Sequence, residues 1–573
     1  MSSNNDTVRP KSNQRIQFEL KDGATGKATV LSNQPKRIGK WGDWVNVQLD
    51  GDSESSSINW KNVKSWKPLP ATEKVVLLSS VEKMSQGVLD AKYKEIDNLV
   101  ENNVFDVVPD TGQRRISTKW VITEKIKNEK KIIKARLVAR GFEEKLENTR
   151  TDSPTCSRMS LRLCFTICAL KRWEIQSFNV TSAFLQGNNI EREVYVKPPS
   201  EWDEADELLW KLKRCLYGLN DAPRAWYKRV VQLLVEYGGK ASIYDAAVFL
   251  WHEGDSLIGM TVVHVDDFVY CGTVVWHKNV IDRVYQVLKI GSSARGSFKY
   301  IGLEVSETNE GIFLAQHLYV KELETIPVTA ERAKQKDEPL TREEKAQLRS
   351  VGGKLLWATT QTRADCAYDA CSVSNSGKEP TVKHLLMANK AIKKIKGADV
   401  SVCFPNLGKV SDLSVVAYSD AAHANLPSGA SQGGMIIFLA GNGKVAPITW
   451  QSKKLDRVVK SPLGAETMAL AEAADSSVLV VKMVEEILKT NLPAVTCYTD
   501  SQSLVDHMAT SHVIQDKRLR IDIARLKEMA ELKEIDCKWI SKDHQLADTL
   551  TKAGASSRKL IDVLQSGRLT MVC

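Results

Sequence analysis

The sequence predicts a multidomain protein of mixed α+β and α/β class, and three observations lead to this fold class. The chain has 573 residues, of which 43% are hydrophobic, so it can form several domains with cores of their own. Alternating strand patterns with glycine-containing turns occupy its beginning, and strand and helix patterns alternate through its centre. A run of strands followed by alternating helices and strands returns near the end.

The beginning of the chain predicts a small SH3-like β-barrel. Residues 1–14 are polar and are expected to be disordered. Alternating patterns at 15–20, 27–32 and 44–49 predict strands of a barrel that spans residues 15–70. The barrel carries four tryptophans, Trp41, Trp44, Trp60 and Trp66. Two roles stay open for it, gripping nucleic acid or packing against a neighbouring domain.

The next region begins with a helix and a basic hairpin. A helix within residues 81–105 is predicted by apolar side chains at helical spacing, namely Val88, Ile96, Leu99 and Val100. Residues 119–140 carry eight basic and two acidic side chains. Phosphates are the expected neighbours of such a surface, but a solvated hairpin that binds nothing has the same composition.

An acidic pair, Asp266 and Asp267, interrupts a mainly apolar stretch of the central region. Two strands of a hairpin are predicted on either side of it, Leu257–Val265 and Phe268–Val275. Anions without a partner are costly in apolar surroundings, so the pair predicts a bound cation. A solvated turn is the alternative, because aspartate is common in turns.

The last part of the chain contains a second set of acids. Helical patterns from Thr341 to about Lys396 precede it, and a new order of strands and helices begins near Asp412. Acids stand at two strand ends and two helix starts: Asp420, Glu466, Asp500 and Asp548. Each has a local explanation in a turn or a helix first turn, but together they can converge on one metal-filled cleft.

Five ordered motifs carry a family resemblance. They are Lys-Ala-Arg-Leu-Val-Ala-Arg-Gly (134–141), Ala-Phe-Leu-Gln-Gly (183–187), Leu-Tyr-Gly-Leu (216–219), His-Val-Asp-Asp (264–267) and Tyr-Ile-Gly-Leu (300–303). In this order they resemble the reverse transcriptases of copia-type (Ty1/copia) LTR retrotransposons. The resemblance implies reverse transcriptase fingers and palm at 80–326, thumb and connection at 327–408, and a ribonuclease H-like domain at 410–573. The barrel resembles the tail of an integrase in such a Pol polyprotein.

The resemblance implies a polymerase metal site at the acidic pair. Asp266 and Asp267 match the family's metal ligands, with Asp266 expected to be the firmer one because strand neighbours point to opposite faces. The first palm strand is expected over Glu174–Leu185 and includes Phe184. Within it, Asn179 stands where the family has a third aspartate, and an amide lacks the negative charge that hard cations require. Glu174 lies five residues upstream, on the opposite strand face. We therefore expect impaired polymerase activity.

Five further residues match positions that hold the incoming nucleotide. Arg136 and Lys125 match fingers residues that bind the triphosphate, and Tyr217 and Gly218 match a loop that supports nucleotide and template. Phe184 matches the bulky residue that excludes a ribose 2′-hydroxyl, or it is an aromatic of the palm core. The implied partners are an RNA template, a DNA primer and deoxynucleoside triphosphates.

The four distal acids resemble a ribonuclease H site in every member. The resemblance implies cleavage of the RNA strand of an RNA–DNA hybrid, with two Mg²⁺ or Mn²⁺ ions in each active site. His544 lies in the loop before Asp548 and either assists proton transfer or product release or is an ordinary loop histidine.

The composition of the chain bears on its partner and its cellular location. The net charge of +10 suits a polyanionic partner, and the eleven cysteines show no zinc-ligand spacing and indicate a reducing compartment. We expect no signal peptide and no membrane span, since no run reaches the roughly 18 apolar residues required. These features predict a location in the cytoplasm, within a virus-like particle, or in the nucleus.

Two further points separate the possible functions. Asp110-Thr111-Gly112 has the tripeptide of retroviral aspartic proteases, but Pro109 and the basic residues that follow predict an ordinary turn. No nucleocapsid zinc knuckle and no integrase zinc module occurs in the sequence. Three hypotheses remain: a working reverse transcriptase with ribonuclease H, a ribonuclease H beside a failed polymerase, and a non-enzymatic nucleic-acid-binding remnant.

Overall fold

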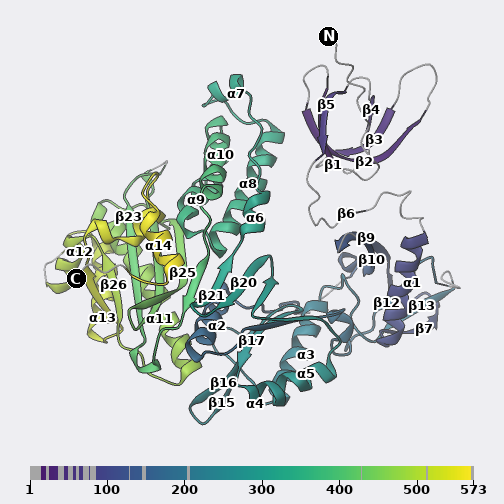
Figure 1. Ribbon diagram of the computed structural model, residues 1–573, viewed down its shortest axis with the longest axis horizontal. Helices are drawn as coiled ribbons and strands as arrows, with labels where there is room; N and C mark the ends of the chain where they lie inside the picture. The colour runs from purple at the N-terminus through teal and green to yellow at the C-terminus, as the bar shows by residue number, and fades with distance from the viewer. Residues whose placement is uncertain are drawn as a thin grey trace. The chain divides into compact units, whose positions relative to one another are not determined.

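The computed structural model divides into two compact units (Figure 1). The first comprises Met1–Thr151 and Phe184–Ala225, and the second comprises Asp152–Ala183 and Trp226–Cys573. The structure describes the chain except for residues 1–14, 21–24, 37–43, 50–55, 60–62, 69–75, 78–85, 128–129, 145–149, 203–206, 427–428, 511–513 and 570–573. For strands before residue 86 and for residues 125–131 it describes the backbone alone.

A five-stranded antiparallel sheet of order β4-β3-β2-β1-β5 begins the first unit. Its strands are β1 Arg15–Leu20, β2 Thr25–Lys36, β3 Trp44–Leu49, β4 Ser56–Asn59 and β5 Val63–Pro68. The three predicted strands are present, and two more complete the sheet. The expected disorder of residues 1–14, and the indoles of the four tryptophans, lie outside what the structure describes.

The rest of the first unit packs a helix and a small sheet against a long hairpin. Its elements are β6 Val76–Leu77, α1 Gln86–Glu101, β7 Phe105–Pro109, β8 Arg115–Ile116, β9 Thr118–Lys127, β10 Lys130–Ala139, η3 Gly141–Glu143, β12 Tyr195–Val196 and β13 Leu208–Leu212. The predicted basic hairpin is confirmed as the β9–β10 pair. Helix α1 buries Val88, Ile96 and Leu99. Val100 was expected on the same face but is 52% exposed, since it follows Leu99 by 100° around the helix axis.

A six-stranded sheet of order β14-β15-β16-β17-β11-β18 forms the centre of the second unit. The strands are β11 Gln176–Val180, β14 Lys240–Ala241, β15 Val248–Glu253, β16 Ser256–His264, β17 Asp267–Gly272 and β18 Ile290–Arg295. The helical segments are α2 Arg158–Lys171, most of α3 Ala222–Glu236, α4 Val274–Trp276, η5 His277–Ile281 and α5 Asp282–Val287. The short η4 Ala183–Gln186 lies at the boundary, and its residues from Phe184 on belong to the first unit. The acidic pair lies where β16 turns into β17.

Two predicted strands are shorter than expected. The strand expected over Glu174–Leu185 ends at Val180, because Ser182 has a positive φ of 51° that a strand cannot contain. The strand expected to reach Val275 ends at Gly272. Thr273 caps a helical turn there by accepting a hydrogen bond from the Trp276 backbone N–H.

A second small sheet and a group of helices follow. The sheet has the order β19-β20-β21-β22, with β19 Ser297–Tyr300, β20 Leu303–Thr308, β21 Gly311–Ala315 and β22 Val402–Pro405. The helices are α6 His317–Glu322, α7 Ala330–Lys334, α8 Arg342–Gln361, η6 Ala364–Cys366, α9 Ala367–Ser374 and α10 Val382–Lys396. The helical pattern predicted from Thr341 is confirmed, since Thr341 forms a capping box with Glu344 at the start of α8.

The last sheet has the order β25-β24-β23-β26-β27. Its strands are β23 Ser414–Ala422, β24 Gln432–Gly441, β25 Lys444–Lys454, β26 Val495–Thr499 and β27 Ile535–Trp539. The first three strands are antiparallel, whereas β26 runs parallel to both β23 and β27. The helical segments are η7 Val410–Asp412, α11 Pro462–Leu488, α12 Gln502–Ala509, α13 Lys517–Glu531, η9 Lys542–His544, η10 Leu546–Leu550 and α14 Arg558–Ser566.

One continuous apolar core joins the sheets of the second unit. It contains buried side chains of α2, β16, β17 and β20–β22 together with those of β23–β26 and α11. Arg162 of α2 crosses this core, donating hydrogen bonds to the carbonyls of Ile448 and Gln361 at 3.1 Å each. Its guanidinium lies 3.6 Å from the ring centroid of Trp450 in β25. The distal sheet is therefore packed against the central one as part of a single folded body.

Candidate active sites

The acidic pair lies in a two-residue turn of the β16–β17 hairpin. His264 pairs with Asp267 across the hairpin, which leaves Val265 and Asp266 as the turn residues. Val265 has a φ of 58°, an uncommon conformation for a β-branched residue. Strain of this kind persists only where the surroundings hold it.

Two hydrogen bonds fix this turn. The Trp226 indole N–H donates to the carbonyl of Val265 at 2.7 Å. The backbone N–H of Val180, on β11, donates to the carbonyl of Asp266 at 2.9 Å. The turn is therefore held by two elements that lie outside the hairpin.

Asp267, rather than Asp266, belongs to the strand. Asp267 is the first residue of β17 and pairs directly with Asn179 of β11, so these two side chains share one face of the sheet. The prediction that Asp266 is the firmer metal ligand assumed that both aspartates lie on a strand. This assumption is wrong, because Asp266 is a turn residue. Burial, followed by the charge of Asp266, raises the pKa of Asp267 to about 6. Two half-buried carboxylates on neighbouring residues therefore favour a neutralising cation or proton.

Asn179 is held by its other neighbour strand. Its Oδ1 accepts hydrogen bonds from the backbone N–H of Ser292 at 2.9 Å and from the Ser292 hydroxyl at 3.2 Å. Glu174 precedes β11 and contacts Gln176 and Arg295. Within the described residues, no group of three potential ligand side chains includes Asp266 or Asp267.

Four of the five predicted nucleotide-binding residues lie together in the first unit. The Arg136 guanidinium lies 5.7 Å from the ring centroid of Tyr217, and the Phe184 ring meets the Tyr217 ring edge-on at 5.6 Å. Tyr217 accepts a hydrogen bond at its carbonyl from Ala139 at 2.7 Å. Arg136 is exposed and Phe184 and Tyr217 are half-buried. The side chain of Lys125 lies outside what the structure describes.

Gly218 connects this loop to the hairpin at very close range. It has a φ of 89°, and a Cβ added to it would overlap the carbonyl oxygen of Ala139. We expect Gly218→Ala to lower the free energy of unfolding by at least about 3 kcal/mol, from left-handed strain and overpacking. Gly112→Ala is the control, because Gly112 has a φ of 91° but open space around it, and should cost only about 1–2 kcal/mol. Equal losses in urea unfolding would show that the close approach is unimportant.

Glu95 on α1 gives the first unit a pH dependence. Burial raises its pKa from 4.5 to about 7, although a hydrogen bond from Asn98 and the positive charge of Arg136 oppose the shift. The folded chain thus keeps a proton that the unfolded chain releases, so the contribution of Glu95 to stability is fully present below pH 4.5 and is lost as the pH rises through 7. We expect a decline of about 2 kcal/mol between pH 5 and pH 8.

Urea unfolding followed by tryptophan fluorescence tests this decline. Glu95→Gln should remove most of the pH dependence, whereas Glu101→Gln, at the exposed end of the same helix, should retain it. A decline that persists in Glu95→Gln would assign the effect to another group.

Three of the four distal acids converge. Asp420 lies on β23, Glu466 in the first turns of α11, and Asp500 directly after β26. Carboxylate oxygens of these three residues all lie within 4.8 Å of one another. The parallel pairing of β23 with β26 brings the two strand ends together, and α11 packs across both strands.

The local environment of these carboxylates suits a cation. Asp420 is 1% exposed, and the buried Oε2 of Glu466 has no hydrogen-bond partner. Burial and then the charges of Asp420 and Asp500 raise the pKa of Glu466 to about 9. Oxygen ligands of this kind fit Mg²⁺ or Mn²⁺. The site therefore has a donor set for divalent metal.

The structure does not bring Asp548 into this group of three. Asp548 lies in η10 and forms an ion pair with Lys552, whose Nζ also lies 3.3 Å from the carboxylate of Asp420. Thr551 donates its hydroxyl hydrogen to Asp420. Lys552 and Thr551 were not expected from the sequence. The available signal was the spacing of Lys552 four residues after Asp548, which is the spacing of helical ion pairs.

Other predicted residues have structural roles. The Nδ1 of His544 lies 2.9 Å from the Ser541 hydroxyl within the loop. Asp110 accepts a hydrogen bond from the backbone of Gly112 at 3.0 Å and pairs with Arg115. The predicted turn at Asp110-Thr111-Gly112 is confirmed.

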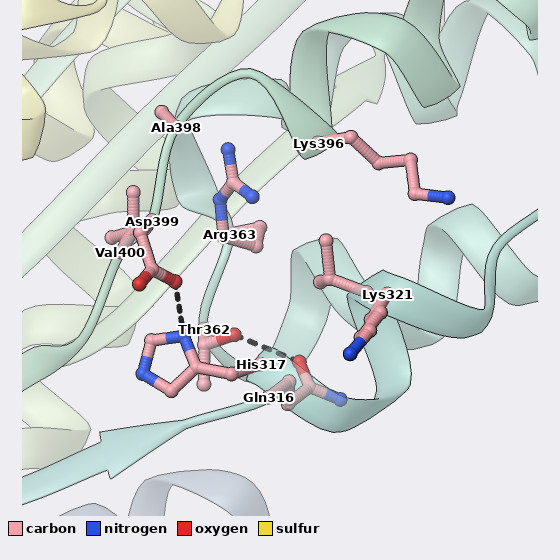
Figure 2. Close-up of a pocket in the computed structure, with 10 residues that line it drawn as sticks. Gln316, His317, Lys321, Thr362, Arg363, Lys396, Ala398, Asp399 and Val400 are labelled. Atoms are coloured by element: carbon pink, nitrogen blue, oxygen red, sulfur yellow. Dashed lines mark hydrogen bonds and ion pairs between the residues drawn. The ribbon is translucent and has the colours of Figure 1, made fainter.

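A cavity of about 250 Å³ lies elsewhere in the second unit, and none of the predicted site residues lines it (Figure 2). Two of the basic side chains that line it have acidic partners. The buried Arg363 donates to both carboxylate oxygens of Asp365 at 2.9 and 2.8 Å, and His317 pairs with Asp399. This cavity is separate from both acidic sites.

The described residues include no helix that is both long and apolar enough to cross a membrane.

Comparison with known proteins agrees with the predicted family. Residues 102–336 match the model of the reverse transcriptase (RNA-dependent DNA polymerase) family. The chain is 28% identical over 487 residues to the retrovirus-related Pol polyprotein from transposon RE1 of Arabidopsis thaliana, covering 81% of this chain and 32% of that protein. It is 25% identical over 509 residues to the Pol polyprotein from transposon TNT 1-94 of Nicotiana tabacum, covering 83% and 37%.

The chain spans about a third of the length of these relatives. Its similarity to them extends over about four fifths of its own residues and thus beyond the family match. Residues 102–336 therefore match the reverse transcriptase family, in a chain that is similar over most of its length to the Pol polyproteins of copia-type retrotransposons.

Proposed function

We propose that the chain cleaves the RNA strand of RNA–DNA hybrids at its distal acidic site, and that its polymerase site is impaired. The observation that carries this proposal is the convergence of Asp420, Glu466 and Asp500 within 4.8 Å. The sheet order β25-β24-β23-β26-β27 with α11 across it supports a ribonuclease H-like domain at 410–573. Fingers and palm then occupy 80–326, thumb and connection 327–408, and the integrase-tail-like module 15–70.

The distal acids would act as metal ligands. Asp420, Glu466 and Asp500, joined by Asp548, would hold two Mg²⁺ or Mn²⁺ ions, which supply an activated water and stabilise the leaving 3′-oxygen. Burial disfavours the charged form of these carboxylates unless a cation neutralises them, as the raised pKa of Glu466 indicates. The chain's own contribution is to place these oxygens at one edge of a rigid sheet.

The polymerase site lacks one charge. Asp266 and Asp267 would hold the divalent ions, while Asn179 offers a neutral oxygen that already accepts two hydrogen bonds from Ser292. Arg136 and Lys125 would bind the triphosphate of a deoxynucleotide, Phe184 would exclude the ribose hydroxyl, and Tyr217 with Gly218 would support the nucleotide. The substrates of this reaction would be an RNA template, a DNA primer and deoxynucleoside triphosphates.

The test uses the whole chain, because the distal sheet shares its core with α2 and β20–β22. An isolated 410–573 fragment would expose this core and lose Arg162, whose guanidinium donates a hydrogen bond to the carbonyl of Ile448. The full chain is incubated with an end-labelled RNA–DNA hybrid, with the same RNA alone, and with a primed RNA template. We expect Mg²⁺-dependent cleavage of the RNA in the hybrid only, together with weak primer extension. An intact hybrid would refute the nuclease, and strong extension that depends on Asp266 would refute the impairment.

A further inference from the structure

Lys552 is a cation within the distal acidic site. Its Nζ lies 3.3 Å from carboxylate oxygens of Asp420 and forms an ion pair with Asp548. Its side chain is 33% exposed, whereas the side chain of Asp420 is 1% exposed. Among the ion pairs of the described residues, those of Lys552 are the ones that reach any of the four acids.

Asp420 takes part in two groups of side chains. Its carboxylate lies within 4.8 Å of those of Glu466 and Asp500, and among the described residues no ion pair reaches Glu466 or Asp500. The Nζ of Lys552 lies 3.3 Å from both carboxylate oxygens of Asp420 and also pairs with Asp548.

We propose that Lys552 is a positioning residue that holds Asp548 beside Asp420 and makes the two divalent ions bind in order. This inference rests on the proposed nuclease function. Asp420, Glu466 and Asp500 would hold the first ion, because no ion pair of the described residues reaches Glu466 or Asp500. A second ion would use Asp548 together with Asp420, and it would then compete with the ammonium of Lys552 for these two carboxylates.

The chemistry of lysine suits this exchange. An ammonium is a compact point charge on a flexible four-carbon stem, so it can neutralise two carboxylates and then move into water with little rearrangement of the backbone. Without it, Asp548 would be repelled by the other acids of the site. Lys552 thus keeps the metal-free site assembled and lowers the affinity for the second ion.

Direct binding of Mn²⁺ tests this order without relying on activity. Isothermal titration and electron paramagnetic resonance are applied to the full chain carrying Asp266→Asn, so that the polymerase site does not contribute. We expect two bound ions in this parent chain, the second weaker than the first. Lys552→Met should tighten the second ion about tenfold, which corresponds to the loss of one competing ion pair, while the first ion changes by less than about threefold.

Three further variants make the result specific. Lys552→Gln removes the charge with a polar side chain and should behave like Lys552→Met, so one of the two suffices if the other folds poorly. Lys552→Arg retains the charge and should keep the second ion weak. Lys482→Met is the matched control, because Lys482 pairs with Glu485 on the exposed face of α11 at 3.0 Å, and it should leave both ions unchanged.

Thermal unfolding supplies a second measurement. In the absence of metal, Lys552→Met should melt at a lower temperature than its parent. Added Mn²⁺ should raise the melting temperature of Lys552→Met by more than that of the parent. Unchanged or weaker binding of the second ion in both neutral variants would overturn the inference and leave the nuclease proposal standing. A chain that binds no Mn²⁺ at this site, with a titration identical to that of Asp420→Asn, would overturn both.

Discussion

Asn179→Asp should raise primer extension by at least about a hundredfold over the natural sequence. Changes in groups that merely orient metal ligands typically alter activity by roughly 10–100-fold, so restoring a ligand itself should do at least as much. Asn179 pairs directly with Asp267, and a carboxylate at this position adds the negative oxygen that the neutral amide lacks. The third carboxylate should also make the charged form of the site more dependent on a bound divalent cation, since Asp267 already has a raised pKa of about 6.

The structure indicates that an aspartate fits without rearrangement. The Oδ1 of Asn179 accepts hydrogen bonds from the backbone N–H and the hydroxyl of Ser292, and a carboxylate oxygen accepts both equally well. We therefore expect the variant to fold like the natural chain.

Extension of a DNA primer on an RNA template, in Mg²⁺ and in Mn²⁺, measures the effect. The double variant Asn179→Asp with Asp266→Asn is the control and should return to the low level. If Asn179→Asp remains as inactive as the natural chain, a defect other than the missing charge disables the polymerase site.

Glu466→Gln should reduce cleavage of RNA in a hybrid by at least about a hundredfold. Groups that merely orient metal ligands typically alter activity by roughly 10–100-fold, so the loss of a ligand itself should do at least as much. The change keeps the shape of the side chain but removes the charge that metal binding requires. Stability in the absence of metal should change by less than about 1 kcal/mol, because with a pKa of about 9 Glu466 is itself neutral in the metal-free chain at pH 7. Activity and folding are thereby separated in one variant.

Glu472→Gln is the matched control for this experiment. Glu472 lies on the same helix α11 but pairs with Lys453 at 3.0 Å and has a 41% exposed side chain. It should retain full cleavage. Comparable loss in Glu472→Gln, or retained cleavage in Glu466→Gln, would remove the distal acids from the mechanism.

Local patterns predicted the elements of both sites well. The β16–β17 hairpin follows from two apolar strands around Asp266 and Asp267, since strand period and turn chemistry depend on neighbours in sequence. The convergence of Asp420, Glu466 and Asp500 was also predicted, but it needed the family resemblance. Parallel pairing of β23 with β26 joins residues 80 positions apart, and periodicity does not reveal such partners.

The sequence could not predict features that depend on tertiary packing. The positive φ of Val265 is held by a hydrogen bond from Trp226 of helix α3. Nothing in the sequence of the hairpin requires this backbone conformation. Lys552 was missed because its two partners belong to different elements, one of them 132 residues away. Phe184 was placed on a strand that ends four residues earlier, because a single backbone angle at Ser182 interrupts it.

The core that joins the two sheets of the second unit sets a limit on how this chain can change. On the proposed function, a substitution such as the amide at Asn179 would remove one reaction without disturbing the packing of β16 and β17. Deletion of these two strands would be a different event, because their apolar side chains belong to the core that also supports β23 and α11. A chain under selection for the nuclease alone would therefore retain a polymerase domain as its scaffold, long after that domain had stopped copying RNA.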